Sequence, residues 1–351
     1  MSSESLIEID GARGEGGGQI IRSSLALSAI TGKPFRVFNI RAGRKKPGLK
    51  NQHLMSVEAA RRICNAKLTG DQLGASSLTF EPNQIVGGTY EFKMQTAGST
   101  SLVAQTILPA LMLGDSDSTV VIEGGTHNPM APTFDFLQRS YLPQLATCGP
   151  QVVASIERHG LFPRGGGKIE LQIQPCEALR GFELLQRGAL KSKSVTALVA
   201  ALPTDIGQRE IDTFCRKAGW SKNCGRVVEL EGNHAPGNVL MADIEYENVT
   251  ASFTAYGEQG KTAERVAAGL YREVKAYLDK VAPVEEYLAD QLMLPMGLAA
   301  SRGETSCFHT GTLSGHSKTH LELLSCFLDI ETLVEKVDDS YRVEISPGLA
   351  D

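Results

Sequence analysis

The chain repeats one local order three times, and this repetition narrows the possible folds more than any other feature of its 351 residues. Each segment contains a short strand, a turn rich in small residues, an apolar helix and a second strand. The segments cover residues 6–42, 89–125 and 305–346. Apolar residues in the helices recur at helical spacing, while the flanking runs are short and β-branched or alternating. Recurrence of this order predicts stacked α/β units.

A segment of different character separates the second unit from the third. Residues 190–256 read as strand, helix, strand and strand, and an amphipathic helix follows over 261–280. We expect residues 185–280 to form a small inserted α/β domain. The large domain would then be discontinuous, comprising residues 1–184 and 281–351.

Three more helices are predicted from apolar spacing, at residues 53–66, 131–149 and 282–299. Pro283 would lie in the first turn of the last one, where its missing N–H is tolerated. Residues 160–173 read as a glycine turn followed by a strand.

The formal net charge of −5 argues against a general nucleic-acid coat, but the charges are unevenly distributed. Residues 33–62 hold nine Lys or Arg and a single acid, Glu58, which leaves 26 basic and 39 acidic residues elsewhere. A local field of one sign indicates a partner that carries phosphate groups. A solvated basic face is the alternative.

Seven cysteines are scattered along the chain without a CxxC pair. Their odd number and irregular spacing argue against a disulfide framework and against a thiolate zinc site. We therefore expect a reducing, cytoplasmic location, with the thiols acting as small buried apolar groups. No run of about 18 apolar residues occurs, so no membrane span is expected, and the first residues lack the pattern of a secretory signal.

The turn GEGGGQ, residues 14–19, leads directly into a helix and could offer its free N–H groups to a phosphate. It lacks the lysine and the spacing of a Walker motif, so a tight structural turn is the alternative. Glu15 lies in this turn, and Gln19 and Arg22 lie three residues apart on one helical face. Arg22 could hold a phosphate bidentately or form only a surface salt bridge.

Arg41 and Arg44 flank a glycine and proline turn within the basic segment. We interpret them as ligands for the backbone phosphates of an RNA or DNA end. Farther along, Tyr287, Asp290 and Gln291 follow the i, i+3, i+4 spacing of one helical face. An aromatic ring with a carboxylate and an amide could stack on a nucleotide and hydrogen-bond to it, and a solvated face is the alternative.

Three histidines, His309, His316 and His320, lie near the C-terminus. Their spacing is compatible with a zinc site, with a nucleophile, or with ordinary polar residues at a helix start. We expect residues 314–319 to be a loop equivalent to the glycine-rich turns of the other units, with Thr319 as the N-cap. His320 would then open the helix and share no face with His316, which disfavours zinc.

The dipole at a helix N-terminus disfavours the imidazolium form, and a neutral imidazole is a nucleophile. His320 could therefore attack phosphorus in a nucleoside triphosphate. A capping or packed histidine remains the alternative.

Several long blocks resemble one known family, the RNA 3′-terminal phosphate cyclases. In chain order these are DGARGEGGGQIIRSSLALSAITGKPFRVFNIRAGRKKPGLKNQH, TAGSTSLVAQTILPAL, GGTHNPMAP, RHGLFPRGGG and VEEYLADQLMLPM, between residues 10 and 297. The resemblance implies a mixed α/β (α+β) fold. It would have a large domain of three repeated units, each a four-stranded sheet with two helices, and a small inserted α/β domain.

The resemblance also implies a reaction in which ATP drives conversion of an RNA 3′-terminal phosphate to a 2′,3′-cyclic phosphodiester. A histidine attacks the α-phosphorus of ATP, which releases pyrophosphate and leaves a covalent histidinyl-AMP. AMP then passes to the RNA to give an RNA(3′)pp(5′)A end, and attack by the 2′-hydroxyl releases AMP. A divalent metal, Mg²⁺ or Mn²⁺, and cationic side chains would offset the charge on phosphorus.

Carried onto this sequence, the resemblance makes His320 the nucleophile and Glu15 the metal-linked carboxylate, although the choice of His320 over His316 or His309 depends on helix register. The implied ATP pocket comprises Gln105, Pro132, Phe136, Tyr287, Asp290 and Gln291, with Pro132 and Tyr287 flanking adenine. The implied ligands of the RNA terminal phosphate are Arg22, Arg41, Arg44 and Gln52.

Two other functions remain open. The family has a non-catalytic branch that acts as a binding protein in ribosome assembly and lacks the nucleophilic histidine and part of the arginine set. The presence of His320, Arg22, Arg41 and Arg44 favours the enzyme. An enolpyruvyl transferase would share only the fold units and would need no nucleophilic histidine.

Overall fold

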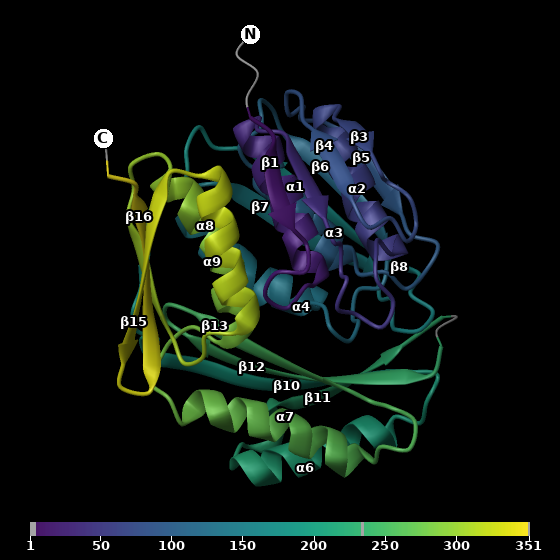
Figure 1. The fold of residues 1–351 in the computed structure, drawn as a ribbon. Helices are drawn as coiled ribbons and strands as arrows, with labels where there is room; N and C mark the ends of the chain where they lie inside the picture. Colours follow the sequence, from purple (N-terminus) through teal and green to yellow (C-terminus); the bar gives the residue numbers. More distant parts are fainter. Residues whose placement is uncertain (1–4, 233–234, 350–351) are drawn as a thin grey trace.

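The computed structural model describes residues 5–232 and 235–349, and within these ranges the chain forms four sheets of four strands each (Figure 1). Three of the sheets belong to repeated units and the fourth belongs to the insert. This arrangement confirms the predicted mixed α/β fold. In the same described ranges, no helix combines the length and the apolar character needed to cross a membrane.

Each repeated unit follows the order strand, helix, strand, helix, strand, strand. The first comprises β1 Ile7–Asp10, α1 Gly18–Thr31, β2 Phe35–Phe38, α2 Asn51–Cys64, β3 Lys67–Thr69 and β4 Leu78–Glu81. The second comprises β5 Thr89–Lys93, α3 Thr100–Leu111, β6 Ser118–Gly124, α4 Phe134–Phe136, the π-helix η1 Leu137–Tyr141, α5 Leu142–Thr147, β7 Gln151–Arg158 and β8 Gly167–Gln174. The third comprises β9 Glu183–Leu184, α8 Glu286–Ala300, β14 Ser306–Thr310, α9 Gly315–Phe327, β15 Ile330–Val337 and β16 Ser340–Pro347.

The three sheets share one topology. Their strand orders are β1-β2-β4-β3, β5-β6-β8-β7 and β9-β14-β16-β15. In each, the first two strands are parallel and the other two pairs are antiparallel. A parallel pair needs a crossover, which α1, α3 and α8 supply. These three helices are therefore equivalent.

This equivalence corrects the predicted third repeat. The third unit begins at β9, so the insert interrupts that unit between β9 and α8 and does not lie between the second and third units. Consequently α9 is the counterpart of α2, and the turn before it is not equivalent to the glycine turns before α1 and α3. Strand β9 has only two residues, too few to show a periodic pattern.

The start of α9 also differs from the prediction. Its N-cap is Ser314, whose hydroxyl accepts a hydrogen bond from the Ser317 N–H at 3.0 Å. Thr319, the predicted cap, lies inside the helix, where its hydroxyl donates to the carbonyl of Gly315 at 2.9 Å. Both residue types can cap a helix, so residue type alone does not decide between the two positions.

The predicted starts of two other helices were also wrong. Pro283 precedes α8, because the carboxylate of Glu285 accepts hydrogen bonds from the N–H groups of Tyr287 and Leu288 and so caps the helix after the proline. The helix expected over 131–149 is divided into α4, η1 and α5 and begins only after Thr133, whose hydroxyl accepts from Phe136 N–H.

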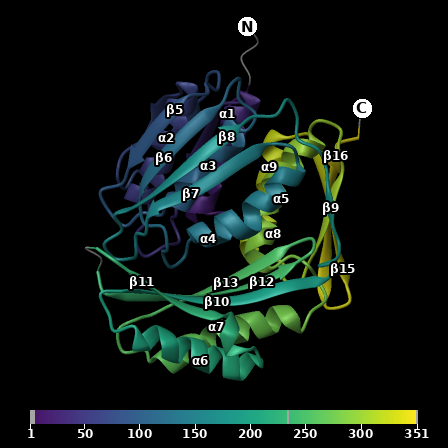
Figure 2. The same cartoon turned by 180° about the vertical axis from the view of Figure 1, so that it is seen from behind.

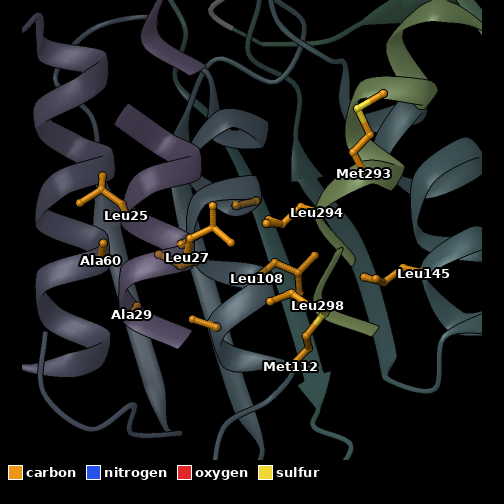
Figure 3. Close-up of a cluster of buried hydrophobic side chains, with 14 of the residues drawn as sticks. Leu25, Leu27, Ala29, Ala60, Leu108, Met112, Leu145, Met293, Leu294 and Leu298 are labelled. Carbon is orange, nitrogen blue, oxygen red and sulfur yellow. The ribbon is translucent and has the colours of Figure 1, made fainter. Parts of the chain in front are cut away.

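One apolar core joins the three units. Figure 3 shows side chains of α1, α3 and α8 gathered in a single cluster, among them Leu27, Leu108, Leu294 and Leu298. These helices are apolar on nearly all sides because they pack between sheets and one another. Each fully buried leucine contributes roughly 1.5–3 kcal/mol to folding. The core therefore fixes how the three helices meet.

The insert has its own sheet and a second core. Its elements are β10 Leu190–Ala200, α6 Asp205–Ala218, the 3₁₀ helix η2 Lys222–Cys224, β11 Gly225–Leu230, β12 Gly237–Tyr246, β13 Thr250–Tyr256 and α7 Ala263–Leu278. The strand order is β11-β10-β12-β13, with α6 and α7 on one face of the sheet and α4 facing the other (Figures 1 and 2). The only tryptophan, Trp220, lies in this core beside Phe214. We propose residues 185–280 as a separate domain on the strength of this second core.

Candidate active site

A small cavity of about 40 Å³ lies where the three equivalent helices meet α9. It is large enough for ordered water or a phosphate oxygen but not for a nucleotide, so a nucleotide bound here would have to extend beyond it. Most of the residues that line it have polar or charged side chains. The lining residues are Gln19, Arg22, Ser23, Gln105, Pro109, Tyr141, Asp290, Gln291, Leu294 and His320.

The repeated architecture explains why these residues converge. Ser23, Gln105 and Gln291 are each the sixth residue of their helices, α1, α3 and α8. Equivalent positions on equivalent helices therefore point to one centre. His320, the sixth residue of α9, completes the ring from the fourth helix.

His320 is buried and held at both ring nitrogens. Its Nδ1 lies 3.0 Å from the carbonyl oxygen of Asp290 and 3.3 Å from Asp290 Oδ1, and its Nε2 lies 3.2 Å from Ser23 Oγ. Both Asp290 atoms can only accept, so Nδ1 must carry the proton. The lone pair is then on Nε2, where the Ser23 hydroxyl donates to it, at the cavity wall.

Asp290 is the central acid of the site. Burial alone would raise its pKa, but hydrogen bonds from His320 and from Gln19 hold the pKa below its usual value. The Gln19 amide donates to Asp290 Oδ1 at 2.5 Å. An ionised carboxylate here both fixes the imidazole tautomer and can stabilise positive charge on the ring.

His316 lies on the same face of α9 as His320, one turn earlier, which corrects the predicted separation of the two rings. Its Nδ1 lies 2.9 Å from Gln19 Oε1 and its Nε2 lies 3.0 Å from Glu15 Oε2. Both ring nitrogens therefore face oxygens of other residues, and His316 is not among the residues that line the cavity. His309 lies on β14 and is absent from the cavity lining.

Two donors in the cavity lack protein partners. Burial lowers the pKa of Arg22 to about 10, partly offset by the Asp290 carboxylate, so the guanidinium stays cationic near neutral pH. It makes no hydrogen bond or salt bridge to any described residue. The amide nitrogen of Gln105 is buried and, among the same residues, has no hydrogen-bond partner. Such groups are suited to an anionic ligand.

The other two predicted arginines lie outside the cavity lining. Arg44 donates to the carbonyl of Glu15 at 2.7 Å and so adjoins the glycine turn. Arg41 has a positive φ of 54° and donates to the carbonyls of Lys46 and Gly48, so it shapes its own loop.

Four further predicted residues also lie outside the lining. Gln52 accepts from the N–H of Ser99 and donates to its carbonyl, which joins the first unit to the second. Pro132 and Phe136 lie just before and within α4, and Phe136 is buried. Tyr287, in the first turn of α8, is 60% exposed.

Glu15 is the predicted metal-linked carboxylate. In the described part of the chain, no three His, Cys, Asp or Glu side chains are arranged to hold a metal ion. Mg²⁺, however, is commonly bound by one or two carboxylates together with substrate phosphates. A single exposed carboxylate therefore fits a cation that arrives with a nucleotide.

Gln19, Ser23, Pro109, Tyr141 and Leu294 also line the cavity, and the sequence interpretation did not assign them to the site. A usable signal existed for Ser23, which lies four residues after Gln19 on the same helix and at the position equivalent to Gln105. Tyr141 had none, because the π-turn that places it is not visible in residue spacing.

The fold and the site define a class of protein in which three repeated α/β units meet at a histidine–aspartate pair flanked by an arginine. The chain belongs to the RNA 3′-terminal phosphate cyclase family, whose family model, described as "RNA 3'-terminal phosphate cyclase", matches residues 13–334. It is 42% identical over 341 residues to the protein of that name from Koribacter versatilis, covering 97% of this chain and 95% of the relative. Identity is 43% over 340 residues to the one from Ralstonia nicotianae (97% and 96% covered), and 44% over 341 residues to the one from Salmonella enteritidis (97% and 99%).

Proposed function

We propose that this chain is an enzyme that uses ATP to convert an RNA 3′-terminal phosphate to a 2′,3′-cyclic phosphodiester, releasing pyrophosphate and AMP. The observation that carries the proposal is the lone pair of His320 Nε2 at the wall of a cavity with a cationic arginine. Membership of the cyclase family and the names of its relatives support it.

In the first step, His320 Nε2 attacks the α-phosphorus of ATP. The N–P bond forms, the bond to the β-phosphate oxygen breaks, and pyrophosphate leaves. Asp290 keeps the proton on Nδ1 and stabilises the positive charge that develops on the ring. Arg22 balances negative charge on the phosphoryl oxygens.

In the second step, an oxygen of the RNA 3′-phosphate attacks the phosphorus of histidinyl-AMP and the N–P bond breaks. In the third, the vicinal 2′-hydroxyl attacks the 3′-phosphorus and AMP leaves. Arg22 and Arg44 would hold the terminal phosphate. Arg41 and Gln52 join them, because each has N–H groups beyond those that it uses for the protein backbone.

The nucleotide would extend outward from the cavity. Gln105 offers its unpartnered amide and Gln291 lies beside Asp290, while the exposed ring of Tyr287 and Pro132 would flank adenine, with Phe136 behind them. Glu15 would hold Mg²⁺ or Mn²⁺, which offsets phosphate charge when it is bound. The thiols, all free in the described ranges, support a cytoplasmic location.

The alternative is a non-catalytic RNA-binding role in ribosome assembly. A protein with that role needs no nucleophile, whereas here a buried carboxylate orients an imidazole toward a cavity. The orientation of His320 by Asp290 therefore favours the catalytic role over the binding role.

The test is incubation with α-labelled ATP and Mg²⁺ or Mn²⁺. We expect acid-labile, alkali-stable label on the wild-type protein and on His316→Ala, and none on His320→Ala. Folding of each variant is checked by circular dichroism. Absence of label on the folded wild type would overturn the cyclase, and label that persists in His320→Ala but is lost in His316→Ala would overturn the choice of nucleophile.

A further inference from the structure

Residues 132–141 connect the outer part of the proposed nucleotide site to its inner cavity. The segment begins at Pro132, continues through Phe136, and ends at Tyr141, which lines the cavity. Its last turn is the π-helix η1, a rare conformation that is frequent at functional sites. Anything that fixes this segment therefore fixes one wall of the site.

The insert contacts this segment through a buried polar network. Arg139 on η1 pairs with Asp135 at 3.1 Å and with Asp243 on strand β12 of the insert. Ser140, also on η1, donates to Ser252 Oγ on β13 at 2.9 Å, and Ser252 donates to Asp243 Oδ1 at 2.6 Å. Asp243 thus uses both carboxylate oxygens to hold two consecutive residues of η1, one directly and one through Ser252.

The network continues beyond Asp135. Its second oxygen lies 2.8 Å from His127 Nε2, and His127 Nδ1 lies 2.9 Å from Thr126 Oγ1. His127 is fully buried, so Asp135 is held from both sides. The pKa of Asp135 is kept below its usual value by His127 and Arg139 despite burial.

The Arg139 guanidinium therefore bridges two carboxylates, that of Asp135 in the second unit and that of Asp243 in the insert. The planar fork of arginine can serve both, which an ammonium group could not do in the same geometry. Buried charged pairs contribute little net stability, and their best-attested use is to fix one arrangement among several. Tyr141 at the end of η1 lines the cavity, so the shape of the cavity depends on the position of η1.

Other contacts between the insert and the second unit lie away from this wall. Gln144 on α5 donates to the carbonyl of Asn248 at 2.8 Å, and Tyr256 donates to the carbonyl of Asn128 at 2.8 Å. Figures 1 and 2 show α4 and the strands of the insert facing each other. The insert is thus docked by several bonds, and those of the Asp243 network hold Arg139 and Ser140 of η1.

We propose that Asp243, acting through Ser252 and Arg139, is a positioning residue for nucleotide binding, and that the insert serves the reaction by fixing the 132–141 wall. This inference rests on the proposed function, because it takes ATP as the ligand of that wall. It predicts a weaker affinity for ATP, with little change in the rate at saturation, when the network is broken.

The experiment measures ATP affinity by equilibrium dialysis with α-labelled ATP in the His320→Ala background, where no covalent label forms. We expect Asp243→Asn to weaken binding about 10-fold, within the range for coupling through packed networks. The matched control, Gln144→Ala, removes a contact between the same two parts of the chain and should change the affinity less than about 2-fold. With His320 restored, the labelling rate at saturating ATP should stay within about 3-fold of wild type.

A second pair of variants, both at Ser252, provides the test if Asp243→Asn does not fold. Ser252→Ala should weaken ATP binding about 3-fold, and Ser252→Thr, which keeps the hydroxyl, should restore it. Equal affinities for Asp243→Asn and Gln144→Ala, or equal losses in Ser252→Thr and Ser252→Ala, would overturn the positioning role. A wild-type protein that binds ATP but takes no label would overturn the proposed function instead, and the two failures are therefore distinguishable.

Discussion

Asp290 determines which nitrogen of His320 can act as a nucleophile. Its carbonyl and its carboxylate both accept from Nδ1, which leaves the lone pair on Nε2. No spacing within the sequence could reveal this, because Asp290 and Ser23 lie 30 and 297 residues from the histidine. His316, four residues away, has other partners, is more exposed and does not line the cavity.

Replacement of Asp290 by Asn should therefore impair adenylylation while leaving the fold intact. The amide removes the charge that stabilises the ring and allows the wrong tautomer. We expect the initial rate of α-labelled AMP transfer to fall about 10²–10⁴-fold. Ser23→Ala is the control, since it removes only the hydroxyl that donates to Nε2 and should cost less than about 10-fold. A wild-type rate in Asp290→Asn would show that the carboxylate does not orient His320.

Glu210 gives a second prediction at this scale, which concerns stability. Its carboxyl group is fully buried in the insert, one oxygen accepts from Asn238 and the other has no partner among the described residues. Burial raises its pKa from 4.5 to about 7. Between these values the folded chain holds a proton that the unfolded chain has released, so the free energy of unfolding falls as the pH rises through this window.

Glu210→Gln removes this titration. The difference in unfolding free energy between the variant and the wild type should shift by about 3 kcal/mol in favour of the variant from pH 4.5 to pH 8. Urea unfolding followed by the fluorescence of Trp220, the only tryptophan, reports on the insert that contains Glu210. A difference that stays constant over this range would mean that Glu210 titrates normally.

At the scale of single elements, the glycine turn before α1 combines left-handed backbone angles at Gly14 and Gly16 with a close approach of other side chains at Gly18. A Cβ on Gly18 would overlap His53 Nε2 and would lie 3.0 Å from Arg22 Nη1. His53 cannot move aside easily, because it is buried and its Nδ1 accepts from the Lys50 N–H at 3.1 Å. A side chain at this position therefore displaces Arg22 or His53.

We expect Gly18→Ala to lower stability by about 1–3 kcal/mol, the usual cost of overpacking, and to weaken binding of a 3′-phosphorylated RNA. Gly43→Ala, in the basic loop, is the matched control, because a Cβ there meets nothing within 4 Å. Its stability should change by no more than about 0.5 kcal/mol. Thermal unfolding and RNA titration check both, and equal behaviour of the two variants would contradict the steric explanation.

The helices and strands also show which parts of the fold can be predicted from sequence patterns. The helices α1, α3 and α8 were predicted because long apolar periodic runs are the most reliable signal. The prediction missed the start of α9, where Ser314 and Thr319 are both good caps and only tertiary contacts select one. It missed β3, β4, β7 and β15, and it left β9 unassigned because two residues carry no pattern.

At the scale of the whole molecule, threefold repetition explains the site better than any single motif. Ser23, Gln105 and Gln291 meet because three equivalent helices place their sixth residues at one centre. The family resemblance named Arg22, Gln105, Asp290, Gln291 and His320 as site residues, and the structure brings these five together. It could not show that the cavity lining excludes Arg41, Arg44 and Gln52, because the two arginines depend on how their loop closes and Gln52 on its bonds to Ser99 of the second unit.

Two chain segments connect the insert to the interrupted third unit, one entering the insert and one leaving it. Arg187 joins these two segments. It lies just after β9 on the way into the insert and donates to the carbonyls of Tyr277, Lys280 and Ala282 on the way out. Its guanidinium also lies 3.8 Å from the centroid of the Tyr277 ring. Of these three carbonyls, that of Tyr277 lies in the last turn of α7 and also accepts from the Lys280 N–H, while those of Lys280 and Ala282 follow the helix.

Arg187→Ala should therefore destabilise the connection by about 2–4 kcal/mol, since several charge-assisted hydrogen bonds are lost together. Hydrogen exchange at the amides of Asp279 and Lys280, which close the last turn of α7, should accelerate correspondingly. Arg209→Ala, which removes an exposed ion pair with Glu264, is the control and should leave exchange at these amides unchanged, because exposed ion pairs contribute little to stability. If both variants left exchange at these amides unchanged, the insert would be held by its docking face alone, and Arg187 would be only a surface contact.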